Sequence, residues 1–297
     1  MPELPEVETI RLKLEPHLVG RRFDRVEIND SRLVRPFEPQ AVAAELEGER
    51  VSALERRGKY LIVQFESGRA LLIHLRMTGS LRHATRGLLA EDPHRRAVVS
   101  LDDESDVAYR DVRRFGTWLL LKPGELQPYL AAKVGREPLE RSFSARHLRE
   151  LLENRRAPLK AALLDQRTVA GLGNIYVDEA LWRARLHPLR PAQTLDAEEV
   201  ARVTRAIKEA LKAGISRQGA SLRDYATPDG GRGRMQDRFR VYGRSGRPCT
   251  RCGTPIDKIR AGGRGTWYCP SCQPLDPLQG ASRASSRPSR SRRQSSV

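Results

Sequence analysis

The sequence contains no run of eighteen or more apolar residues, which is the length that a membrane-spanning helix needs. We therefore expect no transmembrane helix. The first residues include Glu3, Glu6 and Glu8, where a secretory signal peptide would carry lysine or arginine ahead of an apolar stretch. We therefore expect a protein that is not secreted.

Cysteine is scarce: the 297 residues include four, all between positions 249 and 272, so they cannot crosslink the rest of the fold. Cys249 and Cys252 form one C-x2-C pair, and Cys269 and Cys272 form another, sixteen residues further on. Four thiolates in such pairs close a tetrahedral shell around Zn²⁺. A closed shell has no position for water, so the predicted zinc is structural. Two disulfides or four free thiols are the alternatives.

Lysine is scarce too: the sequence contains eight lysines and 46 arginines. The 54 basic and 37 acidic residues give a net charge of +17, which indicates nucleic acid as the first partner and an anionic membrane surface as the second. Residues 280–297 contain five arginines, seven serines and no acid, while the other residues still carry +12. That composition predicts a disordered basic tail that adds phosphate contacts.

The few lysines are of interest because lysine can release a proton near neutral pH and arginine cannot. Lys59 opens a predicted strand and is a candidate for proton transfer. Lys160 stands at a short predicted helix and is a candidate for holding a phosphate. At each position, a solvated surface lysine is the alternative.

The N-terminus joins a small second residue, Pro2, to an acid, Glu3. Removal of Met1 would expose a secondary amine, and an α-amino group with a pKa near 8 is partly neutral at pH 7. Such an amine can attack a sugar C1′ and form an iminium ion that is activated for elimination. The alternative is that proline and glutamate serve here only as residues that favour the start of a helix.

Two segments, His74–Gly79 and Asp111–Gly116, each place arginine and a large apolar side chain, Met77 or Phe115, beside glycine. Apolar wedges accompanied by arginine are what proteins insert between stacked bases, although both side chains could equally be core residues.

A third segment, Gly171–Asn174, precedes a predicted helix. With Asn174 as the N-cap, this turn would leave backbone amides free for a phosphate, but such turns are common. Between the cysteine pairs, Gly262–Gly265 predicts a hairpin tip that carries Arg264, as a DNA contact or as one more solvated arginine.

Apolar patterning predicts two differently built halves. The first half is mostly β and begins with a helix: a helix at 4–19 and strands at 59–65, 70–75, 98–101, 107–109 and 118–121. The second half is helical: helices at 144–153, 159–164, 174–186 and 196–213, then a Gly- and Arg-rich loop over 214–248.

Taken together and in this order, these motifs resemble those of the formamidopyrimidine-DNA glycosylase family, the bacterial base-excision enzymes for oxidised purines. The resemblance rests on Pro2–Glu8, Arg57–Lys59, His74–Gly79, Arg113–Gly116, Gly171–Tyr176 and the four-cysteine finger, and it covers residues 1 to about 273. The Pro-Glu-Leu-Pro-Glu-Val start favours this branch over the endonuclease VIII branch, which usually has glycine in place of Leu4. The basic tail is a departure, since the family usually ends a few residues after the last cysteine.

The resemblance implies the catalytic roles. Pro2, after loss of Met1, would be the nucleophile at C1′, Glu3 would protonate the opening sugar, and Glu6 would support that site. Lys59 would hold a phosphate and serve β-elimination, and Arg264 would grip DNA and serve δ-elimination.

The resemblance also implies the DNA contacts. Met77, Arg113 and Phe115 would fill the gap left by the flipped nucleotide. The remaining contacts would come from His94, Arg155, Lys160 and Asn174, and a loop over 219–235 would cover the extruded base.

The implied fold class is α+β and multidomain. We expect an N-terminal catalytic β-sandwich over 1–130, a helical DNA-binding domain with a helix–two-turn–helix over 131–240, a zinc finger over 241–275 and the tail over 276–297. The implied partner is duplex DNA with an oxidised purine or abasic site and no membrane, and the DNA is bound by a monomer in the bacterial cytoplasm. The alternatives are a glycosylase for oxidised pyrimidines and a zinc-finger DNA-binding protein without catalysis.

Overall fold

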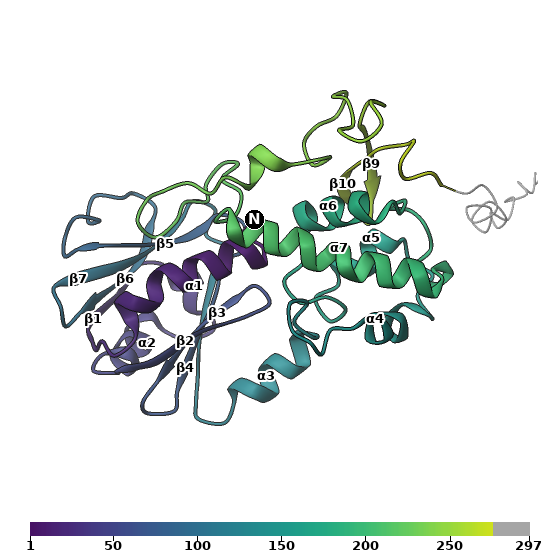
Figure 1. Ribbon diagram of the computed structural model, residues 1–297. Helices are drawn as coiled ribbons and strands as arrows, with labels where there is room; N and C mark the ends of the chain where they lie inside the picture. Colours follow the sequence, from purple (N-terminus) through teal and green to yellow (C-terminus); the bar gives the residue numbers. More distant parts are fainter. Residues whose placement is uncertain (276–297) are drawn as a thin grey trace, which may run out of the picture.

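The computed structural model describes residues 1–275, and the predicted basic tail lies outside the described residues. A β-sandwich and a helical unit lie side by side, and a small finger stands over the helical unit (Figure 1). The helices are α1 (Leu4–Leu18), α2 (Pro39–Leu46), α3 (Leu126–Lys133), α4 (Ala145–Leu152), α5 (Leu159–Leu164), α6 (Asn174–Ala184) and α7 (Ala197–Ser216). The strands are β1 (Phe23–Ile28), β2 (Val51–Arg57), β3 (Tyr60–Phe65), β4 (Ala70–His74), β5 (Gly79–Thr85), β6 (Arg95–Leu101), β7 (Ser105–Asp111), β8 (Thr117–Leu121), β9 (Asp257–Ala261) and β10 (Arg264–Tyr268).

The sandwich consists of two four-stranded antiparallel sheets, ordered β1-β6-β7-β5 and β2-β3-β4-β8. Their facing side chains form one buried apolar core. Helix α1 joins this core through Val7, Ile10 and Leu14, whose spacing of three and four residues places them on one face of the helix. The first residue of the helix, Leu4, packs instead into the core of the helical unit, so α1 bridges the two halves.

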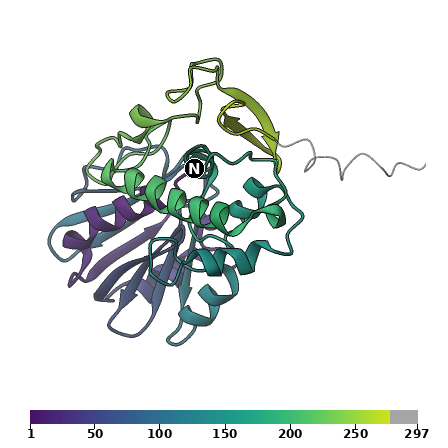
Figure 2. The ribbon, with the colours of Figure 1, turned by 45° about the vertical axis from the view of Figure 1, so that its right-hand side comes forward.

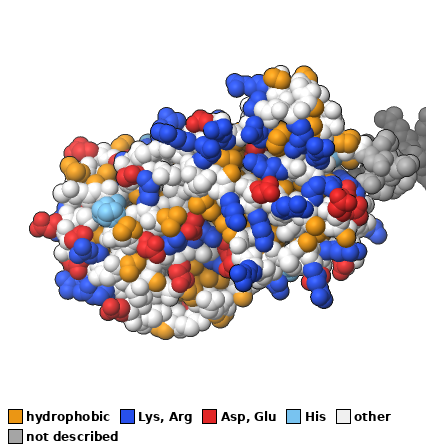
Figure 3. All heavy atoms as spheres, viewed as in Figure 1, with side chains coloured by type: hydrophobic (Ala, Val, Ile, Leu, Met, Phe, Trp, Pro, Cys, Tyr) orange, Lys and Arg blue, Asp and Glu red, His pale blue; other side chains and the backbone are white. Residues whose placement is uncertain are grey.

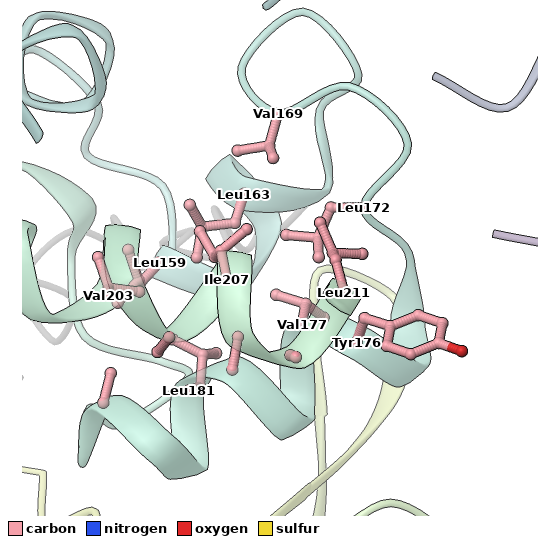
Figure 4. Close-up of a cluster of buried hydrophobic side chains, with 14 of the residues drawn as sticks. Leu159, Leu163, Val169, Leu172, Tyr176, Val177, Leu181, Val203, Ile207 and Leu211 are labelled. Atoms are coloured by element: carbon pink, nitrogen blue, oxygen red, sulfur yellow. The ribbon is translucent and has the colours of Figure 1, made fainter. Parts of the chain in front are cut away.

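The helical unit is built around α5, α6 and α7, whose apolar faces meet in a second core (Figure 4). At Gly214 of α7, an added Cβ would lie 2.5 Å from Tyr176 and 2.7 Å from Pro5, so glycine is what allows α7 to approach α6 and α1 this closely. Tyr176 lies at the edge of the cluster, with its hydroxyl pointing away from the aliphatic side chains (Figure 4).

The finger is the β9–β10 hairpin with the cysteine-bearing turns, and Trp182 of α6 packs against it. Gly262 and Gly263 form its tip with φ values of 56° and 75°. Arg264 is the first residue of the returning strand and pairs with Ala261, so the predicted tip over 262–265 is shorter than expected.

Most predicted elements are confirmed, with ends shifted by one to three residues. The prediction missed β1, α2, β2, β5 and α3, which are short and have mixed polar patterns, and the expected boundary at 130/131 falls inside α3. Among residues 1–275, no helix combines the length and apolar character required to cross a bilayer.

Candidate active site and DNA-binding surface

The N-terminus lies at the junction of the sandwich, the helical unit and the finger, as two views agree (Figures 1 and 2). Pro2 is buried and Glu3 is only 2% exposed. The backbone N–H of Leu4 donates to the carbonyl of Gly171 at 3.0 Å, which ties the chain start to the segment before α6. At Gly171, φ is 77°, and an added Cβ would lie 2.6 Å from Leu4, so this contact requires glycine.

The Glu3 carboxylate lies at the N-terminus of α6. It accepts hydrogen bonds from the backbone N–H groups of Ile175 at 2.9 Å and Tyr176 at 3.3 Å. An added Cβ at Gly173 would lie 2.3 Å from the Glu3 carboxyl carbon. The prediction that Asn174 caps α6 and leaves its amides open to phosphate is therefore wrong: Gly173 is the N-cap, and a carboxylate from the other end of the chain occupies those amides.

Glu6 is a buried acid that holds three parts of the molecule together. Its Oε2 accepts from the Glu3 N–H, and its Oε1 accepts from the Tyr176 hydroxyl and the Ala220 N–H, all at 2.8 Å. Burial and the nearby charge of Glu3 raise the pKa of Glu6 to about 7. Glu6 thus joins α1 and α6 to the start of the 219–235 loop. From this position it can support the site of Pro2 and Glu3, as the resemblance implies.

Lys59 lies in the turn between β2 and β3 and is 6% exposed. Burial lowers the pKa of its ammonium, and Arg264 adds to this shift, while the charges of Glu3 and Glu6 oppose it. Within residues 1–275 its nitrogen has no hydrogen bond and no ion pair with another protein group, so Lys59 faces the N-terminal acids without a direct protein partner.

The turn that presents Lys59 is fastened by Glu137, a residue that sequence reasoning missed. The Glu137 carboxylate accepts from the backbone N–H of Gly58 and pairs with Arg56 at 2.8 Å. Arg56 also pairs with Glu8 of α1 at 2.8 Å. In the sequence, Glu137 is one more acid in a polar linker, and nothing near it indicates that it binds the turn of Lys59.

Lys160 is in a different position from the one expected. It is completely buried, its Nζ lies 2.8 Å from an Asp178 oxygen, and it donates to the Gly265 carbonyl at 3.0 Å and the Thr266 hydroxyl at 2.9 Å. All of its donors are used inside the protein, so the predicted phosphate contact does not fit this structure. Asp178, which sequence reasoning missed, also accepts from the Trp267 N–H at 3.1 Å.

Asn174 and Arg264 meet at the finger. The Asn174 amide donates to the Gly265 carbonyl at 3.1 Å, and Asn174 Oδ1 is buried without a hydrogen-bond partner. Arg264, next to Gly265, is exposed, and its charge acts on Lys59. The structure therefore brings Glu3, Lys59, Asn174 and Arg264 into one neighbourhood from four separate segments.

Met77 and Arg113 line a cavity of about 870 Å³ together with Pro2 and Glu6. Phe115 is 52% exposed, and the Arg113 guanidinium carbon lies 4.7 Å from the centre of its ring. A half-exposed phenylalanine in contact with an exposed arginine is not a core residue, so the core alternative for Phe115 is wrong.

The opposite wall of this cavity comes from the loop over 219–235 and the segment that follows it. Leu222, Arg223 and Asp224 line the cavity, and Tyr225 packs into the sandwich core. Lys13 of α1 pairs with Asp229 at 2.7 Å, which anchors the loop on the sandwich. The sequence could not place these lining residues.

His94 and Arg155 are not among the residues that line this cavity. The His94 carbonyl accepts from the Asp111 N–H at 3.0 Å, which places His94 beside the turn that carries Arg113. Arg155 pairs with Asp165 at 2.9 Å on the helical unit, with about a third of its side chain exposed. Their DNA contacts stay predictions.

The four cysteines converge, with all Sγ atoms within 4.8 Å of one another. Four sulfur donors at this spacing suit a tetrahedral ion with metal–sulfur bonds of about 2.3 Å. They fit one structural Zn²⁺, with no protein position left open for substrate.

Basic side chains gather on the face that carries these residues. Lys and Arg side chains lie along the upper side, over the loop and the finger, and across the helical unit (Figure 3).

Comparison with known proteins covers nearly the whole described chain. The family models that match are the formamidopyrimidine-DNA glycosylase N-terminal domain over 1–118, the formamidopyrimidine-DNA glycosylase H2TH domain over 134–226, and the zinc finger found in FPG and IleRS over 246–275.

Two curated relatives are named formamidopyrimidine-DNA glycosylase. The protein from Symbiobacterium thermophilum is 46% identical over 277 residues, which is 93% of this chain and 90% of the relative. The protein from Roseiflexus is 44% identical over 92% of this chain and 100% of the relative.

Solved structures agree with these sequence relatives. A variant of the Lactococcus lactis FPG in complex with Fapy-dG DNA superposes with a TM-score of 0.87 at 39% identity, covering 92% of this chain and all of that one. MutM in complex with DNA containing carbocyclic 8-oxo-G gives 0.86 at 39% identity and the same coverage. The chain belongs to the formamidopyrimidine-DNA glycosylase family of base-excision repair enzymes.

Proposed function

We propose that this protein extrudes oxidised purines, 8-oxoguanine and formamidopyrimidines, from duplex DNA, excises them, and cleaves the abasic strand by β,δ-elimination. The observation that carries the proposal is the convergence of Pro2, Glu3 and Lys59 beside a cavity on a basic face. Relatives solved with DNA containing Fapy-dG, a carbocyclic 8-oxo-G and an abasic site support this substrate class.

In the proposed chemistry, loss of Met1 exposes the secondary amine of Pro2, which attacks C1′ of the damaged nucleotide. The new N–C1′ bond replaces the glycosidic bond, whose electron pair leaves with the base, and the base takes up a proton. Opening of the sugar gives an iminium ion. That ion acidifies the C2′ proton, whose loss lets the 3′-phosphate leave by β-elimination. The resulting unsaturated iminium acidifies the C4′ proton, whose loss lets the 5′-phosphate leave by δ-elimination.

Each nearby side chain has a place in this scheme. Glu3 protonates the sugar oxygen as the ring opens, while the α6 amides hold its carboxylate in place. Lys59, whose pKa burial lowers, can give up and take a proton near C1′ or neutralise the adjacent phosphate. Arg264 and Asn174 bind the phosphate on the finger side.

Excision also requires the base to leave the stack. Met77, Arg113 and Phe115 would enter the space left by the extruded nucleotide, and the cavity wall over 222–225 would close on the base. The structural zinc keeps the finger folded, and Lys160 takes a supporting role there instead of a phosphate contact.

Borohydride trapping on a duplex with one 8-oxoguanine tests the proposal, since only an iminium can be reduced to a stable adduct. We expect the wild-type adduct on the Pro2 peptide, and none for P2G or for protein that retains Met1, although both still bind DNA. An adduct on a lysine peptide, or no adduct, contradicts the assignment.

The Glu3→Gln variant separates the two chemical stages. It should lose base excision but keep part of the strand cleavage at a preformed abasic site, where no glycosidic bond has to break. Equal loss of both activities would mean that Glu3 only holds α6.

A second substrate class belongs in the same experiment, because a wild-type Lactococcus lactis Fpg has been solved with an oxidised pyrimidine containing DNA. A panel of single-lesion duplexes separates the two classes. Faster excision of the pyrimidine would reverse the order of preference proposed here. We also infer a monomer that acts in the bacterial cytoplasm, which light scattering on the full chain can test for the oligomeric state.

A further inference from the structure

The turn that carries Arg113 and Phe115 is wrapped around one buried carboxylate, that of Asp111, which is 1% exposed at the end of β7. Asp111 Oδ2 accepts from the backbone N–H groups of Phe115 at 2.9 Å and Gly116 at 2.8 Å. Its Oδ1 accepts from the Arg113 N–H at 3.2 Å. Three backbone donors of one turn thus bind a single side chain.

The same carboxylate reaches a second turn. The Thr78 hydroxyl donates to Asp111 Oδ1, and Thr78 Oγ1 accepts from the Arg113 N–H at 3.0 Å. Thr78 directly follows Met77 in the turn between β4 and β5. The turn that carries Met77 and the turn that carries Arg113 and Phe115 therefore share one hydrogen-bond network.

Both turns pack closely against one buried tyrosine, Tyr109. The Tyr109 hydroxyl is buried without a hydrogen-bond partner and lies between Gly79 and Gly116. An added Cβ would lie 2.4 Å from this oxygen at Gly79 and 1.6 Å from it at Gly116. Glycine at both positions is thus a packing requirement, which keeps the two turns pressed on the same side chain.

Arg114 is itself held in place. It has a φ of 59°, and its guanidinium binds the carboxylate of Asp30, with one contact at 2.9 Å. Its neighbours Arg113 and Phe115, on either side in the sequence, contact each other.

We propose that Asp111 and Thr78 are positioning residues that hold Met77, Arg113 and Phe115 as one preassembled group before DNA binds. The proposal rests on the proposed function, in which these three side chains fill the space of the extruded nucleotide. Groups that are fixed before binding lose less conformational freedom in the complex. The network should therefore favour extrusion and discrimination of the base opposite the lesion.

The sharpest variant is Thr78→Val, because valine keeps the shape of threonine and removes only the hydroxyl that links the two turns. Thr78→Ser keeps the hydroxyl and is the matched control. Asp106→Asn is the control for general damage to β7: Asp106 is a buried acid on the same strand that accepts from Ser100 at 2.7 Å and Gly87 at 2.8 Å, away from both turns.

Three rates should be measured at saturating enzyme: single-turnover excision of 8-oxoguanine opposite C, the same excision opposite A, and cleavage at a preformed abasic site. For T78V we expect about a tenfold loss of excision opposite C, the factor that corresponds to one hydrogen bond. The ratio of the rates opposite C and A should move toward one. Abasic-site cleavage should stay within about twofold, since extrusion is easiest where no base is stacked.

T78S should match the wild type on all three rates, and D106N should leave the ratio opposite C and A unchanged even if its thermal midpoint falls. Wild-type ratios in T78V, or an equal loss of all three rates, would overturn the positioning role. Absence of any borohydride adduct in the wild type would instead overturn the proposed function, so the two failures are distinguishable.

Discussion

Two buried lysines occupy opposite situations in this molecule. Lys160, in α5, is fully buried, forms an ion pair with Asp178 and donates two further hydrogen bonds to β10 of the finger. Lys59, in the β2–β3 turn, is also buried, but its ammonium has no direct partner within residues 1–275. Burial lowers the pKa of both side chains, and in Lys160 the attraction of Asp178 opposes that shift.

The difference indicates which lysine stabilises the structure and which is a candidate for the reaction. A buried cation with all its donors satisfied stabilises a fixed arrangement, here the seat of the finger next to Arg264. A largely buried amine whose nitrogen makes no contact with another protein group is free to meet a substrate, and perturbed pKa values gather at functional sites. We therefore predict that Lys59 takes part in the reaction and that Lys160 supports the residues that carry it.

Removing Asp178 should have the largest effect. Asp178→Ala leaves the Lys160 charge buried and unpaired, so we expect the free energy of unfolding to fall by about 3–5 kcal/mol. Urea denaturation of the zinc-loaded full chain measures this change in the free energy of unfolding.

The double variant K160M/D178L is the control, because an apolar pair of similar volume removes both charges at once. It should recover most of the stability. If D178A were as stable as the wild type, Lys160 would not depend on its partner, and the comparison would fail.

The Lys59→Met variant should show the reverse pattern. The free energy of unfolding should stay the same or rise, because the desolvation of an unpaired ammonium is relieved. Excision of 8-oxoguanine should fall by about 10²–10⁴-fold if the ammonium transfers a proton. Single-turnover kinetics beside a denaturant titration measures both quantities.

Lys59→Arg sharpens this test, because arginine keeps the charge but cannot release a proton at neutral pH. Phosphate binding should survive in K59R while proton transfer is lost. Full activity in K59R would reduce Lys59 to a phosphate contact.

Local chemistry in the sequence anticipated much of this arrangement. The helix starting at Leu4, the paired strands and the four-cysteine site follow from short-range periodicity and spacing, and all are present. Pro2, Glu3 and Lys59 were singled out because their chemical types are unusual at those positions, and the structure gathers them near one cavity.

Partners distant in sequence could not be anticipated. The amides before α6 suit an anion, but nothing local shows that Glu3, more than 170 residues away, is that anion. Likewise, Lys160 was read as a phosphate ligand because its partner, Asp178, comes from a different helix. Glu137 and Asp111 were missed for the same reason: a carboxylate in a linker or at a strand end does not reveal which donors surround it.

The smallest expected effect concerns Glu6, one of the two acids that act on Lys59. Its pKa is about 7 in the folded protein, raised by burial and by Glu3, against 4.5 for an exposed glutamate. Between those values the folded state binds more protons than the unfolded state, so this group's contribution to stability is complete below about pH 4.5 and is lost as pH rises through 7. Relative to Glu6→Gln, which cannot ionise, the wild type should lose on the order of 2 kcal/mol between pH 5 and 8, since one pKa unit corresponds to about 1.4 kcal/mol. Urea midpoints for both proteins at several pH values measure the difference, with Glu8→Gln, an acid on the other side of α1 paired with Arg56, as the control.

Because burial lowers the pKa of Lys59 while Glu6 opposes that shift, E6Q should also move the basic limb of the excision profile to lower pH. Parallel stability curves for E6Q and the wild type would mean that Glu6 is already ionised at pH 5, and Lys59 would then face an ionised Glu6 throughout the working range.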